Sequence, residues 1–96
     1  MAKFRKKPVE IIAHQLTNSN FIDLLDWANT IQPADKKILF AYENGEFTGL
    51  HIPTKEGVML CAFGDYLIKE PFPTDDRMFY PCKADMFELT YEQVNE

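Results

Sequence analysis

The sequence predicts an α+β fold in which one short helix packs on a mostly antiparallel, curled or barrel-like sheet of about five to six short strands. Two observations lead to this prediction. One helical stripe of apolar residues is followed by a succession of short strand-like runs, and an Asn-Gly pair separates two of these runs. The 96 residues suffice for a single domain over residues 1–96, and the 46% of hydrophobic residues suffice for a core.

The chain is expected to begin with a strand over residues 9–16, where β-branched residues are frequent and apolar residues recur at alternate positions. A helix over about 20–29 follows, because four apolar residues recur at the spacing of one helix face. The polar residues 17–20 supply side-chain oxygens for its first turn, and Pro33 prevents its continuation. The apolar stripe consists of Phe21, Leu24, Leu25 and Ala28.

A β-hairpin is predicted to turn at Asn44-Gly45, because both residues readily adopt the positive φ of a type I′ turn. Apolar runs over 58–63 and 66–70 predict further strands. Gly64-Asp65 between them is either a tight turn between two strands or a bend within one strand. The remaining expectations are a rigid loop over 71–76, a short strand over 78–80, a turn or single helical turn over 83–86 and a last strand over 87–91.

Buried side chains are expected from the helical stripe and from the strands. The predicted core contains Ile11, Phe21, Leu24, Leu25, Leu39, Leu60, Leu67 and Phe87. Cys61 and Cys82 are expected to be free thiols, because no CxxC motif occurs and the N-terminus does not resemble a secretion signal.

Charge is divided unevenly along the chain. Residues 1–7 contain four basic residues and no acidic one, whereas the other 89 residues contain six basic and fifteen acidic residues, a net charge of −9. A short basic arm can contact phosphate, but the acidic body repels polyanions, so general nucleic-acid binding is disfavoured. No apolar run approaches the roughly 20 residues of a membrane span, so no membrane association is expected.

The sequence shows no catalytic or metal-binding motif, so we expect no enzyme activity, no cofactor and no metal site. Neither His14 nor His51 lies in a recognisable motif, and Ser19 occupies a position typical of a helix cap. Four scattered glycines cannot form a phosphate-binding loop. The spacing of the two histidines and two cysteines matches none of the paired zinc motifs.

A candidate binding surface is expected around the GDY segment and residues 79–85. Its predicted binding residues are Asp65, Tyr66, Lys69, Tyr80, Lys83 and Asp85. Tyrosine rings with polar tips suit a surface that both packs and recognises, and Asp65 is expected to accept hydrogen bonds from backbone N–H groups two residues further on. The alternative interpretation is structural: Gly64-Asp65 shapes the sheet, and the residues from Lys83 to Asp85 cap the next segment.

Two strings in the C-terminal half, FGDYLIKEP at 63–71 and FYPCKADMFELTYE at 79–92, resemble small bacteriophage and prophage proteins that share a PGDYG-type motif. The opening FRKKPVEIIAHQL resembles the basic start of the same proteins. The chain departs from the motif at Phe63, where the family has Pro, and at Leu67, where it has Gly. The resemblance implies an accessory protein in the cytoplasm of an infected bacterium, and it supplies no catalytic residues.

The expected function is therefore that of a non-catalytic phage-encoded accessory protein that binds and modulates a host protein, for instance as a defence inhibitor. The acidic surplus favours a basic partner. One alternative is a sponge for an anionic nucleotide signal, for which Lys69, Arg77 and Lys83 would have to converge beside aromatic rings. A homo-oligomer could complete such a pocket. Another alternative is a minor virion-associated structural protein.

Overall fold

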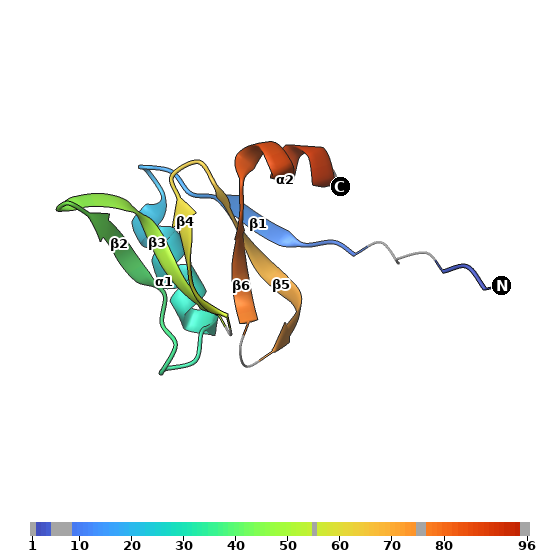
Figure 1. The fold of residues 1–96 in the computed structure, drawn as a ribbon, viewed down its shortest axis with the longest axis horizontal. Coiled ribbons are helices and arrows are strands. Elements are labelled where there is room, and N and C mark those ends of the chain that lie inside the picture. Colours follow the sequence, from blue (N-terminus) through green and yellow to red (C-terminus); the bar gives the residue numbers. More distant parts are fainter. Residues whose placement is uncertain (1, 5–8, 55, 75–76, 95–96) are drawn as a thin grey trace.

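The computed structural model describes residues 2–4, 9–54, 56–74 and 77–94. Within them the chain forms two helices and two three-stranded antiparallel sheets, which do not close into a barrel (Figure 1). The strand orders are β1-β5-β6 and β2-β3-β4. The predicted α+β class is confirmed. In chain order the elements are β1 (Ile12–Gln15), α1 (Phe21–Ile31), β2 (Leu39–Glu43), β3 (Glu46–Thr54), β4 (Gly57–Ala62), β5 (Tyr66–Thr74), β6 (Arg77–Cys82) and α2 (Ala84–Thr90).

The predicted hairpin is formed by β2 and β3. Asn44 and Gly45 both have positive φ, 53° and 82°, as the type I′ geometry requires. The two strands pair antiparallel on either side of this turn, with Glu43 opposite Glu46. Local turn chemistry therefore fixes the register next to the turn, and an irregularity between Ala41 and Tyr42 shifts the register of the remaining pairs by one residue.

The Gly64-Asp65 segment is a tight turn, so β4 and β5 are two strands and belong to different sheets. Gly64 has a φ of 91°, and the Asp65 N–H donates to the Ala62 carbonyl at 3.0 Å. Leu16, just after β1, bonds to the same turn: its N–H donates to the Asp65 carbonyl at 2.9 Å, and its carbonyl accepts from the Gly64 N–H at 2.8 Å. The turn thus joins three strands.

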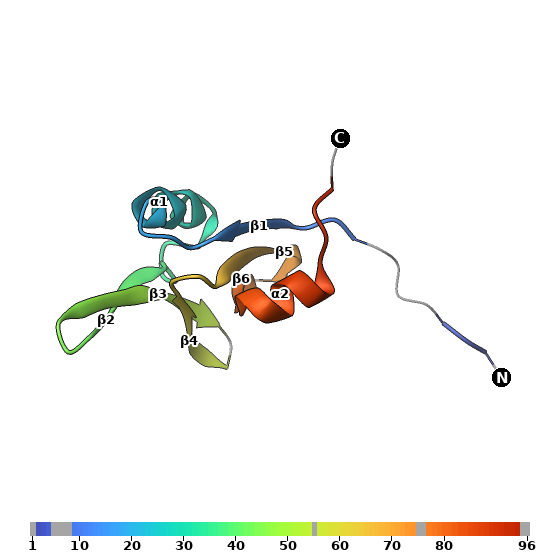
Figure 2. The same cartoon turned by 90° about the horizontal axis from the view of Figure 1, so that it is seen from above.

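Helix α1 packs against both sheets (Figure 2). Its buried residues Leu24 and Ala28 belong to the same core cluster as residues of both sheets. Trp27 extends this contact, because its ring lies 5.4 Å from Phe79 of β6. The helix is two residues longer than expected at its C-terminus. Asn20 does not cap it with its side chain, which instead accepts from the Thr17 N–H and donates to the Gln15 carbonyl.

The predicted core is wrong at Leu39 and Leu60, whose exposed fractions are 63% and 45%. Leu39 of β2 and Leu60 of β4 are both paired with His51 of β3, and they lie on the face of the sheet opposite the buried Leu50 and Cys61. Successive side chains of a strand point to opposite faces, so a one-residue error exchanges core and surface. Ile11 and Phe87 also lie outside the core cluster.

The strand predicted over 87–91 is wrong, because α2 occupies Ala84–Thr90. The helix begins after Lys83, which is extended, and its first bond runs from the Phe87 N–H to the Lys83 carbonyl at 2.8 Å. Phe87 and Tyr91 are four residues apart, so a helix directs both rings to one side. This pairing outweighs the strand propensity of the aromatic and β-branched residues.

The loop predicted over 71–76 is wrong for its first four residues, because β5 continues to Thr74. The pairing with β6 nevertheless passes directly from Lys69 to Thr74. Pro71 and Pro73 cannot donate to a ladder, which explains the interruption. Residues 75–76 lie outside the described residues. Strand β1 is shorter than predicted, and β6 is longer, over Arg77–Cys82.

Candidate functional site

Four of the six predicted site residues meet near the start of α2. Asp65 immediately precedes β5, Lys83 immediately follows β6, and Tyr66 is paired with Cys82 between them. Tyr80 lies two residues before Cys82 on the same strand and therefore on the same face of the sheet. Antiparallel pairing of β5 and β6 is thus what brings Asp65 and Lys83, 18 residues apart in the chain, together.

The Asp65 carboxylate is buried, and two groups contact one of its oxygens. Its Oδ2 accepts a hydrogen bond from the Ala62 N–H at 3.1 Å and lies 3.3 Å from the Lys83 ammonium. The donor precedes Asp65 by three residues, so the expected bond to a group two residues further on is wrong. Because the Lys83 side chain is 69% exposed, water screens the ion pair, and the N–H bond matters more for stability.

The aromatic side chains near Asp65 attach α2 to the sheet. The rings of Tyr66 and Phe87 are stacked, with centroids 3.8 Å apart and planes 6° apart. Phe87 also contacts Tyr91 at 4.9 Å, and the hydroxyl groups of Tyr91 and Tyr80 lie 3.4 Å apart. None of the seven described residues of α2 is buried, so these ring contacts are the main packing of the helix.

Lys69 and Asp85 do not join this group. Lys69 lies three residues beyond Tyr66 along β5, so its side chain leaves the opposite face of the sheet. The exposed Asp85 accepts from the Met86 N–H at 2.8 Å. The convergence of Lys69 and Lys83 that an anionic ligand would need is therefore not formed, and the Arg77 side chain lies outside the described part of the chain.

The two cysteines are free and do not form an activated nucleophile. Burial raises the pKa of the Cys61 thiol to about 12, and the nearby Asp65 carboxylate adds to the effect. The pKa of Cys82 is also raised, first by partial burial and then by Asp65 and Asp85. A raised pKa keeps a thiol protonated at neutral pH, and the thiolate is the reactive form.

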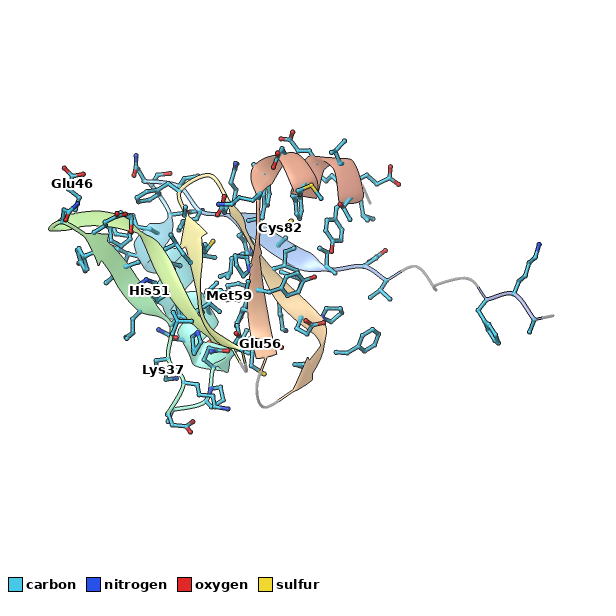
Figure 3. The ribbon with its side chains drawn as sticks, viewed as in Figure 1. Lys37, Glu46, His51, Glu56, Met59 and Cys82 are labelled. Atoms are coloured by element: carbon cyan, nitrogen blue, oxygen red, sulfur yellow. The ribbon has the colours of Figure 1, made fainter. Side chains whose placement is uncertain are left out.

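A groove of about 410 Å³ opens beside Tyr80, between β4 and β6. Its lining residues are Thr54, Glu56, Met59, Tyr80 and Pro81. Figure 3 labels Met59 of β4 and Glu56, which immediately precedes that strand. Met59, Tyr80 and Pro81 make the groove largely apolar, and Glu56 is the one charged residue of the described lining. Sequence reasoning identified Tyr80 alone, because strands from the two different sheets form the groove.

Strand β4, which borders the groove, exposes three consecutive apolar residues. The exposed fractions of Val58, Met59 and Leu60 are 66%, 43% and 45%. In the described sheet, β4 is an edge strand with β3 as its paired neighbour, and no charged residue occurs over Gly57–Ala62. Proteins usually protect such edges with charges or proline. Strand β6 contacts β4 without pairing with it, and the apolar side chains of β4 that stay exposed are typical of an interaction surface.

Within the residues that the structure describes, no three or more His, Cys, Asp or Glu side chains are grouped so that they could hold a metal ion. No helix of the described chain has the length and apolar character needed to cross a membrane. No family model matches the chain, and neither a curated protein nor a solved structure matches it.

Proposed function

We propose that the chain is a non-catalytic binding protein that captures a partner protein at the β4 surface. This surface is defined as the groove residues Met59, Tyr80 and Pro81 together with Val58 and Leu60, which extend from the opposite face of the same edge strand. The observation that carries the proposal is the exposed apolar run on edge strand β4, directly beside an open groove. Apolar side chains of a partner would be removed from water in this groove, which is the main favourable term in protein association.

The charges of the chain favour a basic partner. Glu56 supplies a carboxylate at the groove, and the 89 residues after the first seven carry a net charge of −9. A segment with an apolar anchor next to Lys or Arg would place its cation near Glu56 and the Tyr80 ring. The resemblance to small bacteriophage proteins supports a host protein of an infected bacterium as this partner.

The test uses a photoreactive amino acid introduced at Val58 and, as a matched control, at Leu89 on α2, which is also strongly exposed. After illumination in bacterial lysate, we expect a basic protein to be linked at position 58 and not at position 89. The purified partner is then titrated against the wild type, Met59→Glu and the control Leu89→Glu.

Met59→Glu should weaken binding at least about ten-fold, because loss of the apolar contact and burial of the new carboxylate outweigh its attraction to a basic partner, whereas Leu89→Glu should bind as the wild type does. Both variants alter exposed side chains, so thermal unfolding should stay close to that of the wild type. Equal crosslinking at both positions, or full affinity of Met59→Glu for the linked partner, would contradict the proposal.

A further inference from the structure

The N-terminal residues 2–4 extend away from the rest of the chain in both ribbon views (Figures 1 and 2). Phe4 within them is 96% exposed, the highest value among the large hydrophobic residues described. The first seven residues also carry a charge of +4 in the sequence. A fully exposed aromatic ring on a basic arm gains free energy wherever an apolar, acidic surface can receive it.

A second groove, of about 300 Å³, lies at the base of this arm, between residues 9–12 and 69–73. It exists because the β1–β5 ladder ends at the pair of Ile12 and Lys69, beyond which Pro71 and Pro73 cannot donate hydrogen bonds. We name it the β1–β5 groove.

The walls of the β1–β5 groove are mainly apolar and partly acidic. Val9, Ile12 and Phe72 border it with exposed fractions of 43%, 51% and 71%. Its charged lining residues are Glu10, Lys69 and Glu70, so carboxylates outnumber ammonium groups. The groove therefore offers apolar contact for an aromatic ring and a negative balance for the basic residues beside it.

We infer that this groove receives the N-terminal arm of a second copy of the chain, with Phe4 as the apolar anchor. The groove wall of one copy includes Val9 but none of residues 2–4, which extend away from the body of their own copy in both views and therefore leave its groove open. The basic arm and the acidic body are complementary between copies. Two reciprocal arm-in-groove contacts generate a closed two-fold dimer.

The test is sedimentation equilibrium of the full chain and of two single variants, Phe4→Ala in the arm and Phe72→Glu in the groove. We expect a dimer for the wild type and an increase of the dimer Kd of at least about ten-fold for each variant. Salt should also weaken the dimer, because the Debye length falls to about 3 Å at 1 M. Met59→Glu on the β4 surface is the matched control and should stay dimeric, so a failure here is distinct from a failure of the proposed function.

Mixing the two variants provides the decisive measurement. The Phe4→Ala copy keeps an intact groove and the Phe72→Glu copy keeps an intact arm, so the mixture should regain association that neither variant shows alone. A wild-type chain that sediments as a monomer at every concentration would overturn the inference. The same holds if the arm is then found to fold onto its own chain or to bind a polyanion such as heparin. The absence of recovery in the mixture would overturn it as well.

Discussion

Replacement of Asp65 separates the structural role of this residue from a role in recognition. In Asp65→Ala, the Ala62 N–H loses its side-chain acceptor and Lys83 loses its ion-pair partner. In Asp65→Asn, an oxygen remains to accept from Ala62 while the negative charge disappears. Lys83→Met removes the ion pair alone. The three variants therefore separate the contribution of the Ala62 hydrogen bond to stability from that of the Lys83 ion pair.

The expected decreases in the free energy of unfolding follow from the burial and exposure of these two contacts. Loss of an acceptor for a partly buried N–H costs about 1–3 kcal/mol, whereas an ion pair with a 69% exposed lysine contributes under about 1 kcal/mol. We expect Asp65→Ala to lower the free energy of unfolding by about 2 kcal/mol, and Asp65→Asn and Lys83→Met by under about 1 kcal/mol each. For a domain of this size, 2 kcal/mol corresponds to a decrease in Tm of about 8–16 °C.

Urea unfolding followed by Trp27 fluorescence measures these free energies, and an unchanged m-value would show that the compactness of both states is preserved. If Asp65→Asn destabilises the chain as much as Asp65→Ala, the charge rather than the N–H acceptor stabilises the turn, and the reasoning is refuted. A loss under about 0.5 kcal/mol for Asp65→Ala would refute it as well.

Three further predictions follow from burial and backbone geometry. At pH 8 a thiol reagent should modify the accessible Cys82 slowly and the buried Cys61 only after unfolding. The modification rate of Cys82 should rise with pH, because its pKa lies above the usual value. Rapid modification of both thiols in the folded chain would contradict this prediction. Leu50→Ala should lower the free energy of unfolding in urea by about 2–5 kcal/mol and Leu39→Ala by under about 1 kcal/mol, because Leu50 is fully buried and Leu39 is exposed. The reverse order would show that the buried and exposed faces of this sheet are misassigned. Gly49→Ala should cost at least about 1–3 kcal/mol, since an added Cβ collides with the carbonyl oxygen of residue 61 at a positive φ, and a neutral effect on Tm would disprove this contact.

The elements that could be predicted from sequence are those that local chemistry determines. Asn44-Gly45 requires no distant residue to form its turn, and the stripe containing Leu24 defines the buried face of α1 by spacing alone. The face of the β2-β3-β4 sheet could not be predicted in this way. Leu39 and Leu60 are as apolar as their buried neighbours, and only packing against α1 and the other sheet decides which face is covered.

The candidate site, like the fold, could be predicted only in part. The grouping of Asp65, Tyr66, Tyr80 and Lys83 follows from the pairing of two neighbouring strands, and sequence reasoning anticipated it. The groove could not be anticipated, because Met59 and Tyr80 belong to different sheets whose relative position depends on the whole fold. The separation of Lys69 from Lys83, by contrast, could have been predicted, because β5 begins at Tyr66 as expected and successive side chains of a strand alternate between its two faces.

The pairing of β1 with β5 sets an order of events during protein synthesis. Ile12 has its strand partner at Lys69, so β1 is made long before any strand to which it can bond. Strands β2, β3 and β4 are instead joined by short connections and can pair as soon as they are made. We expect backbone amides of β2–β4 to gain protection before those of β1 in pulsed hydrogen exchange during refolding, and simultaneous protection would contradict this order. Until residue 69 is added, the first strand and its basic arm remain available to chaperones and to other chains.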